Sequence, residues 1–259
     1  MKVYIHTDLE GATNVNSMDM IFDGGELTRY AYENLAYDVN AAIEGAFLAG
    51  ADTVTVLDSH GGPGELDTSI LDPRAELDTD DKLWWGKLNE EYDASIFIGA
   101  HAMAGTLNGF LDHTMDSRKW FNYSINGRRT GELGAWAAVC GHFGVPLVMV
   151  SGDTAACTEA REFFPDVRTV SVKQGLGRND CEMFDVEKSR NEITKTVQKA
   201  LGEIKEHRIY RPVFPADIEL EFQRSDYCDE FFTKLNNAER INSRTIHKKA
   251  NSALEILFE

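Results

Sequence analysis

The chain has 259 residues, of which 42% are hydrophobic and 10% aromatic, enough apolar material to bury one large core. Its formal net charge of -17 repels phosphate backbones and anionic headgroups, so we expect neither nucleic acid nor a membrane as a partner. Apolar runs stay well short of the roughly 18 residues of a membrane span, and polar residues interrupt the N-terminal MKVYIHTDLEG where a signal-peptide core would lie. The sequence therefore predicts a cytoplasmic protein.

Short apolar runs flanked by polar residues predict buried parallel strands in the first part of the chain. They cover residues 3–5, 54–57, 96–98 and 145–150. Between the first two, apolar residues recur at nearly helical spacing over residues 26–49, and the pattern ends at Gly50. A second helix is expected at about residues 132–140. The alternation predicts an α/β fold with an open, mostly parallel sheet flanked by helices.

The second half of the chain predicts a hairpin, a helix and a small lobe. Asn126-Gly127 favours a type I′ turn between strands at about residues 121–130. Residues 186–204 have the pattern of an amphipathic helix, and residues 218–222 alternate apolar and acidic side chains like a half-exposed strand. We expect two packed parts, an α/β catalytic domain at residues 1–210 and a smaller C-terminal α+β lobe at residues 211–259, because no flexible tract separates them.

Side chains that can bind metal follow each predicted strand. They are Asp8 and Glu10 after the first strand, Asp58 and His60 after the second, His101 after the third and Asp153 after the fourth. Open parallel sheets bind ligands at the carboxyl ends of their strands. Crowded carboxylates raise one another's pKa and are tolerated chiefly where a cation neutralises them. The placement therefore predicts a metal site.

The types of ligand indicate the metal. Carboxylates and imidazoles without thiolates suit zinc, cobalt or manganese better than calcium or magnesium, and zinc is the first choice. The four cysteines include no CxxC pair and are interpreted as buried apolar residues. They are Cys140, Cys157, Cys181 and Cys228.

Each motif also has a purely structural interpretation. An Asp-x-Glu pair after a strand is common, Asp58 can cap a turn as readily as it can orient His60, and a lone histidine more often satisfies a hydrogen bond than binds a metal. Their coincidence at successive strand ends favours the metal. Arg128, Arg129 and Arg178 are expected to be surface charges rather than substrate anchors.

The chain resembles the family of zinc D-aminopeptidases associated with dipeptide-transport operons, over about residues 1–222. The motifs that carry the resemblance are His6-Thr7-Asp8-Leu9-Glu10-Gly11, Asp58-Ser59-His60, Gly99-Ala100-His101-Ala102, Asp112-His113-Thr114-Met115, Gly131-Glu132-Leu133-Gly134, Val145-Pro146-Leu147-Val148-Met149-Val150-Ser151-Gly152-Asp153 and Val172-Lys173-Gln174. By this resemblance Asp8 bridges two zinc ions per subunit, His113 is the catalytic histidine, and the remaining metal ligands are Glu10, His60, His101 and Glu132. Without it, the alternative that Glu132 is an acidic residue stabilised by a helix N-terminus stays open.

The resemblance also implies an activity and an assembly. The expected reaction removes the N-terminal residue of short peptides, with a preference for D-residues, in a ring-like homo-oligomer. Trp84, Trp85 and Trp120 are interpreted either as subunit contacts or as core. The alternatives are another two-metal amidase or phosphoesterase, because the same ligands suit phosphoryl transfer, and a catalytically silent peptide-binding relative.

Overall fold

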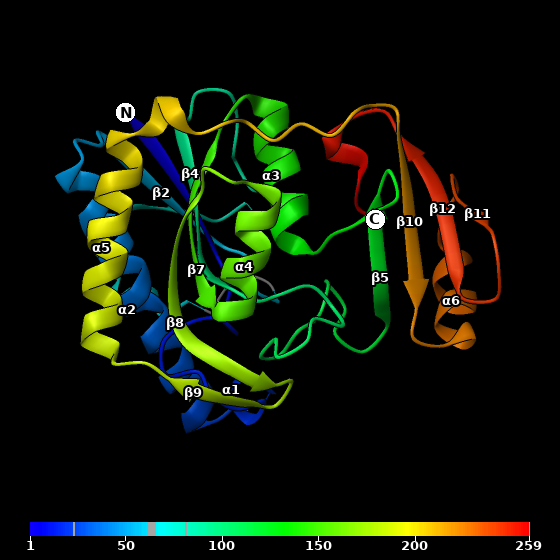
Figure 1. The fold of residues 1–259 in the computed structure, drawn as a ribbon, viewed down its shortest axis with the longest axis horizontal. Helices are drawn as coiled ribbons and strands as arrows, with labels where there is room; N and C mark the ends of the chain where they lie inside the picture. Colours follow the sequence, from blue (N-terminus) through cyan, green and yellow to red (C-terminus); the bar gives the residue numbers. More distant parts are fainter. Residues whose placement is uncertain (23, 62–65, 81, 259) are drawn as a thin grey trace.

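The computed structural model describes residues 1–22, 24–61, 66–80 and 82–258, which form two β-sheets (Figure 1). The larger sheet has the strand order β3-β2-β1-β4-β7-β8-β9. Its strands are β1 (Lys2–Thr7), β2 (Thr53–Asp58), β3 (Glu76–Asp78), β4 (Ala94–Ala100), β7 (Leu147–Asp153), β8 (Arg168–Gly177) and β9 (Asp180–Met183). Its neighbouring strands pair in parallel, except that β9 runs antiparallel to β8. The predicted open, mostly parallel sheet is confirmed.

Helices cover both faces of this sheet (Figure 1). α2 (Glu26–Leu48) and α5 (Val186–Gly202) pack together on one face, whereas α3 (Glu132–Phe143) and α4 (Thr154–Phe163) lie on the other. The short α1 (Asp19–Phe22) precedes α2. The end of the long helix at Gly50 is as predicted, since Gly50 has φ +86° directly after the helix cap. None of the described helices has the length and apolar character needed to span a membrane.

The second sheet is antiparallel and has the strand order β11-β12-β10-β5-β6. Its strands are β5 (Trp120–Ile125), β6 (Arg128–Arg129), β10 (Ala216–Phe222), β11 (Glu239–Arg240) and β12 (Thr245–Ala250), with α6 (Ser225–Phe232) beside them. The β5–β6 turn is the predicted hairpin turn, because Asn126 and Gly127 both have positive φ. This sheet thus joins strands from early and late in the chain, and the division at residue 210 stays a prediction.

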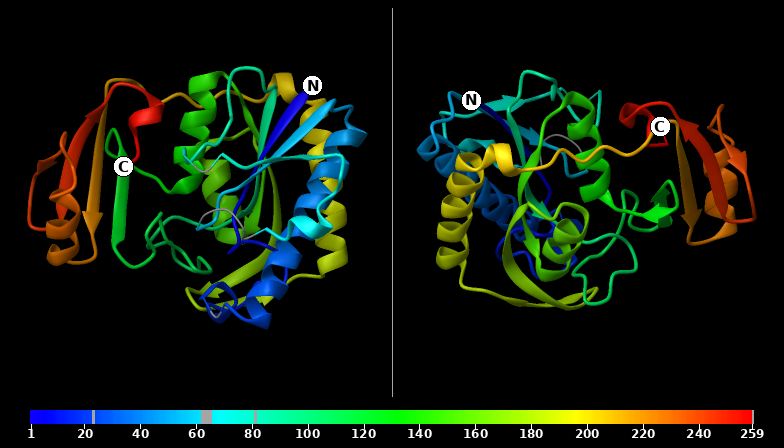
Figure 2. Two further views of the ribbon diagram at one scale, coloured as in Figure 1. Left: turned by 180° about the vertical axis from the view of Figure 1, so that it is seen from behind. Right: turned by 45° about the horizontal axis from the view of Figure 1, so that its top comes forward.

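Three short 3₁₀ turns lie within the described residues. The turns are η1 (Thr68–Ile70), η2 (Ile204–Glu206) and η3 (Ala253–Glu255). The segment between η2 and β10 crosses from the larger sheet to the second one (Figure 2). The segment between β4 and β5 lies between the two sheets in both views (Figure 2), and it carries His101 and His113.

Two apolar clusters form the core. One lies between the larger sheet and α2 and α5, and the other includes α3 and the inner side chains of the second sheet. Trp136 of α3 is fully buried in the second cluster, where its Nε1 donates to Ser95 Oγ at 2.9 Å. Trp85 and Trp120 are buried there as well, and Trp84 packs against it. Trp85 and Trp120 are therefore intramolecular core, whereas for the half-buried Trp84 a subunit contact stays a prediction.

Candidate metal centre

The strand order brings the predicted ligands to one edge of the sheet. β1 pairs with β2 on one side and with β4 on the other, so Asp8, His60 and His101 lie beyond the ends of three adjacent strands. The chain after β1 is pressed against the end of β4. A Cβ on Gly99, which has φ +82°, would lie 1.9 Å from the carbonyl oxygen of Asp8. Glycine is therefore required there for the strand ends to approach this closely.

Asp8 connects two groups of side chains. Its Oδ1 lies 2.8 Å from His60 Nδ1, and Glu10 Oε2 lies 3.0 Å from the same nitrogen. The other oxygen, Oδ2, lies 3.2 Å from Nε2 of His101, which Glu132 Oε1 approaches at 3.3 Å. One carboxylate thus borders both a His60–Glu10 group and a His101–Glu132 group.

Glu132 and His113 close the cluster from outside the strand ends. Glu132 is the first residue of α3, and its Oε1 also accepts a hydrogen bond from the backbone N–H of Met115 at 2.7 Å. His113 Nε2 lies 3.9 Å from Glu10 Oε1 and 3.9 Å from Glu132 Oε1. Its ring stacks on His101, with centroids 3.8 Å apart and planes at 11°. The structure therefore brings all six predicted site residues together.

Backbone carbonyls orient two of the imidazoles. His101 Nδ1 lies 3.0 Å from the carbonyl oxygen of Ala102, and His113 Nδ1 lies 2.7 Å from that of Leu111. With Nδ1–H donating to these carbonyls, each ring turns an Nε2 lone pair toward the cluster. His60 instead presents Nδ1. Each histidine can therefore offer one nitrogen to a metal or a proton.

The loop around His113 is held in a costly backbone conformation. Leu111 and Met115 on either side of it have φ +50° and +56°, a left-handed region that non-glycine residues seldom occupy. Hydrogen bonds hold both residues in place, because Leu111 N–H donates to the carbonyl of Arg178 at 2.7 Å and Met115 N–H donates to Glu132. The placement of His113 is thus fixed from two sides.

The cluster perturbs the pKa of every member. Burial, together with the Glu10 carboxylate, raises the pKa of Asp8 to about 7. Burial also works against charge on His60, His101, Glu10 and Glu132, but there proximity outweighs it: the carboxylates hold the pKa values of His60 and His101 well above their ordinary range, and the imidazoles hold those of Glu10 and Glu132 well below it. For His113, burial and the neighbouring His101 lower the pKa. Without a metal, protons on His60 and His101 offset the charge of the carboxylates.

The donors present fit zinc-type cations. Asp8, Glu10 and His60 can bring one ligand atom each within 4.8 Å of one another, and so can His101, His113 and Glu132. Among the described residues, Asp8 Oδ2, Glu10 Oε2 and His101 Nε2 are buried without a hydrogen-bond partner, which is costly unless a cation takes them. Three carboxylates and three imidazoles without thiolate match the nitrogen and oxygen ligands of zinc.

Two other predicted strand-end residues have structural roles. Asp153 caps α4 by accepting from the N–H of Ala156 at 2.7 Å, and it also accepts from the N–H of Phe110 at 2.8 Å. Asp58 accepts from the N–H of Leu66 at 3.1 Å. For Asp58, this bond supports the turn-capping interpretation.

Sequence reasoning missed two buried residues that support the centre. Lys173 of β8 is fully buried, and its Nζ donates to the carbonyls of Glu10 at 2.7 Å and Val15 at 2.5 Å. Glu159 of α4 accepts from the N–H of Met103, close to His101, at 2.7 Å. A signal for Glu159 existed, because it lies three residues after Ala156 and four before Phe163, on the apolar face of its helix.

Comparison with known proteins gives three matches. A family model described as D-aminopeptidase, peptidase family M55, matches residues 1–258. The chain is 33% identical over 208 residues to a protein of Bacillus subtilis (strain 168) named D-aminopeptidase, with 78% of this chain and 74% of that protein covered. It is also similar to a solved structure described as the Zn-dependent D-aminopeptidase DppA from Bacillus subtilis, a self-compartmentalizing protease. That match has a TM-score of 0.93 and 28% identity, and covers 99% of this chain and 94% of that one.

Proposed function

The chain belongs to the family of D-aminopeptidases, and on this premise we propose that it removes the N-terminal residue of short peptides, with a preference for D-residues, at a two-zinc site. It is a metallo-aminopeptidase. The observation that carries the two-metal proposal is the position of Asp8, whose two oxygens face two different histidines. A carboxylate between two ligand groups suits a bridging role.

We assign the metal ligands according to the His60–Glu10 group and the His101–Glu132 group. Glu10 and His60 complete the site at Asp8 Oδ1, and His101 and Glu132 complete the site at Oδ2. The distances of 2.8–3.3 Å between the ligand atoms within each group support this division. Cobalt or manganese could replace zinc, because the same oxygen and nitrogen ligands bind them.

His113 is proposed to be the catalytic residue. When bound, zinc supplies the Lewis acidity that polarises a scissile peptide carbonyl. His113 would accept at Nε2 a proton from the water that attacks this carbonyl carbon, and would return it to the amine nitrogen as the C–N bond breaks. Its Nδ1–H remains on the carbonyl of Leu111, which keeps Nε2 as the working atom. Burial and the neighbouring His101 lower the pKa of His113, which keeps Nε2 available as a base near neutral pH.

A metal analysis and a peptide assay test the proposal. Protein prepared without chelators should contain about two zinc ions per chain and should hydrolyse D-alanyl dipeptides faster than L-alanyl ones. Trace metal only, with no activity on adding zinc, cobalt or manganese, would overturn it. Release of phosphate from phosphoesters would favour the phosphoesterase alternative. Full metal content with peptide binding but no turnover would favour the silent relative.

Assembly and location are part of the same proposal. The similar solved structure is described as a self-compartmentalizing protease, and we infer a ring-like homo-oligomer that admits short peptides. Light scattering at micromolar concentration should give a mass several times that of one chain. A mass equal to that of one chain would contradict the proposed ring. The cytoplasmic location is tested by cell fractionation.

A further inference from the structure

A cavity of about 440 Å³ opens beside His113. This volume is within the roughly 300–1,000 Å³ typical of small-molecule sites. Three parts of the chain line it: the segment between β4 and β5 with the start of β5, the turn between β8 and β9, and the segment from the end of β10 to the start of α6. The lining residues that matter below are Asp112, His113 and Arg118 from the first part, Arg178 from the second and Arg224 from the third.

Groups of both charges border this cavity. His113, which lines it, has its Nε2 3.9 Å from the carboxylates of Glu10 and Glu132. Three arginines also line the cavity, beside the single carboxylate of Asp112, in a chain whose net charge is -17. A ligand with a positive amine at one end and a negative group at the other would match this arrangement.

The three arginines differ in their partners. Arg224 forms an ion pair with Asp226 at 2.8 Å. Arg178 lies 3.3 Å from Asp112, whose other oxygen accepts from the N–H of Gly105 at 2.5 Å. Asp112 therefore holds the Arg178 guanidinium in place while leaving several of its N–H groups free to donate.

Arg118 has no acidic partner within the described part of the chain. The nearby Asp116 is occupied by backbone groups, since its Oδ1 accepts from the N–H of Arg118 and of Lys119. The Arg118 side chain is exposed and lines the same cavity as His113. It is a cation available to an incoming anion.

We propose that Arg118 and Arg178 bind the C-terminal carboxylate of a short peptide whose N-terminal residue is at the metal centre. This inference rests on the proposed function and narrows its substrate class to short peptides with a free C-terminal carboxylate. Guanidinium groups pair with carboxylates through two parallel hydrogen bonds, which fixes both position and orientation. The enzyme thus selects peptides that carry both a free N-terminal amine and a free C-terminal carboxylate. Arg178 is then a specificity residue and not the surface charge expected from the sequence.

The test compares D-alanyl-D-alanine with its C-terminal amide on the zinc-loaded protein. The wild type should prefer the free acid. KM for the acid should rise in Arg118→Gln and in Arg178→Gln. In the double variant it should rise about ten- to a hundredfold, the size expected from losing charge-assisted hydrogen bonds. KM for the amide and kcat for both should change little. A merely structural role of the two arginines would not change the ratio of the KM for the acid to the KM for the amide.

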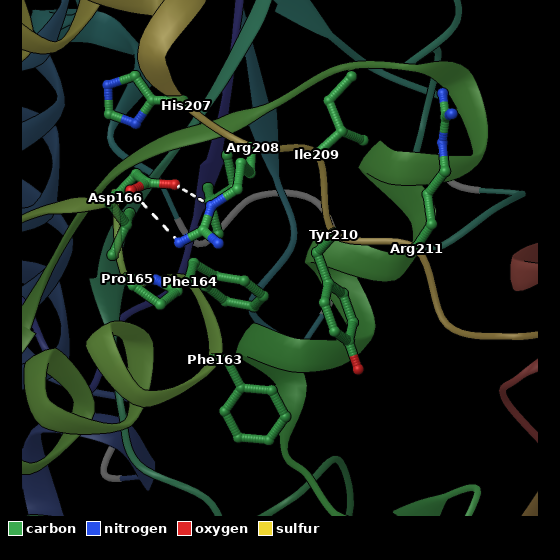
Figure 3. A pocket seen from close by; sticks show the side chains of 11 residues that line it. Phe163, Phe164, Pro165, Asp166, His207, Arg208, Ile209, Tyr210 and Arg211 are labelled. Atoms are coloured by element: carbon green, nitrogen blue, oxygen red, sulfur yellow. Dashed lines mark hydrogen bonds and ion pairs between the residues drawn. The ribbon is translucent and has the colours of Figure 1, made fainter.

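Arg208→Gln is the matched control. Arg208 is an exposed arginine that lines a different cavity, where it pairs with Asp166 at 2.6 Å (Figure 3). This variant should keep the wild-type ratio of acid to amide. Circular dichroism and metal content verify that each variant is folded and loaded with zinc. If the double variant is unfolded, the result for Arg118→Gln tests the proposal instead, because the Arg118 side chain is exposed.

The possible outcomes separate the two proposals. A double variant that keeps the preference for the acid, or loses activity on acid and amide equally, overturns the carboxylate subsite and leaves the aminopeptidase proposal intact. A wild type that cleaves neither peptide overturns both. A wild type that cleaves both equally well overturns the subsite alone.

Discussion

The Oδ2 atom of Asp8 lies 3.2 Å from Nε2 of His101, and neither atom makes a hydrogen bond of acceptable geometry within the described residues. Both atoms are buried. Two such atoms that face one another unbonded are costly in an apolar interior, and a shared cation removes that cost. The same carboxylate meets His60 through its other oxygen, which makes Asp8 the residue on which a two-metal centre depends most.

Asp8→Ala should therefore lose both metals, whereas His60→Ala should lose only the one it serves. Elemental analysis should give close to zero metal per chain for the first variant and about one for the second. Asp153→Asn is the control, since Asp153 is a buried strand-end aspartate engaged with backbone N–H groups. Full metal retention in Asp8→Ala would contradict the bridging role.

His113→Ala should keep its metal and oligomeric state but lose turnover. A positioned proton-transfer group contributes typically about 10²–10⁴-fold to rate, so kcat on a D-alanyl dipeptide should fall by that amount. The exposed His142 of α3 gives a control, His142→Ala, with unchanged kinetics. Near-normal turnover would make His113 a packing residue, and joint loss of metal and activity would make it a ligand.

Removal of the metal should destabilise the fold. The cluster then keeps three crowded carboxylates, with the protonated imidazoles of His60 and His101 as their counter-charges. A ligand that binds only the folded state at 100 times its Kd stabilises it by about 2.7 kcal/mol, so chelation should lower the unfolding free energy by at least that order. Calorimetry with and without a chelator measures this. An unchanged melting temperature would argue against tight binding.

Lys173→Met should destabilise the protein by leaving buried carbonyls of Glu10 and Val15 unpaired. A buried polar group left unsatisfied costs about 1–3 kcal/mol. Denaturant unfolding should show a loss of that order, with lower metal content, since the carbonyl belongs to a proposed ligand. Lys195→Met, at an exposed position of α5, is the control. Equal stability of the two variants would show that the Lys173 contacts contribute nothing net.

Glu159→Gln should change how stability depends on pH. Burial raises the pKa of Glu159 from 4.5 to about 7 in the folded state, so the folded protein holds a proton that the unfolded chain releases between these values. The stability from this group is full below pH 4.5 and is lost as the pH rises to 7. At about 1.36 kcal/mol per unit, the loss is of the order of 3 kcal/mol.

The neutral glutamine has no such dependence. The gain in unfolding free energy of Glu159→Gln over the wild type should therefore be larger at pH 8 than at pH 5. Denaturation at the two pH values measures it. A difference that does not depend on pH would show that Glu159 is ionised in the folded protein at both.

Much of the fold could be predicted from local pattern, since β1, β2, β4 and β7 are short apolar runs buried on both faces. β8 could not, because buried and half-buried positions follow one another irregularly along it. Pairing of β5 with β10 was also beyond prediction. It joins residues about a hundred positions apart, and periodicity carries no information on such distant partners.

Some residues of the candidate site could be predicted from the sequence pattern, and others could not. Asp8, Glu10, His60 and His101 could be located because strand ends converge in an open sheet. Glu132 and His113 could not be found from spacing alone, since one begins a helix and the other lies in a loop shaped by Leu111 and Met115. For these two, only the family resemblance gave the prediction.

The pairing of β5 with β10 also limits how the gene could be shortened. Deleting the last fifty residues would remove β10, the neighbour of β5, and leave β5 as an exposed edge strand. It would also uncover Tyr123, whose hydroxyl donates to the carbonyl of Ile256. That edge strand directly follows the loop of His113 and precedes Glu132. The C-terminal segment is thus a structural brace for the reactive loop, and truncated versions should aggregate before they could be assayed.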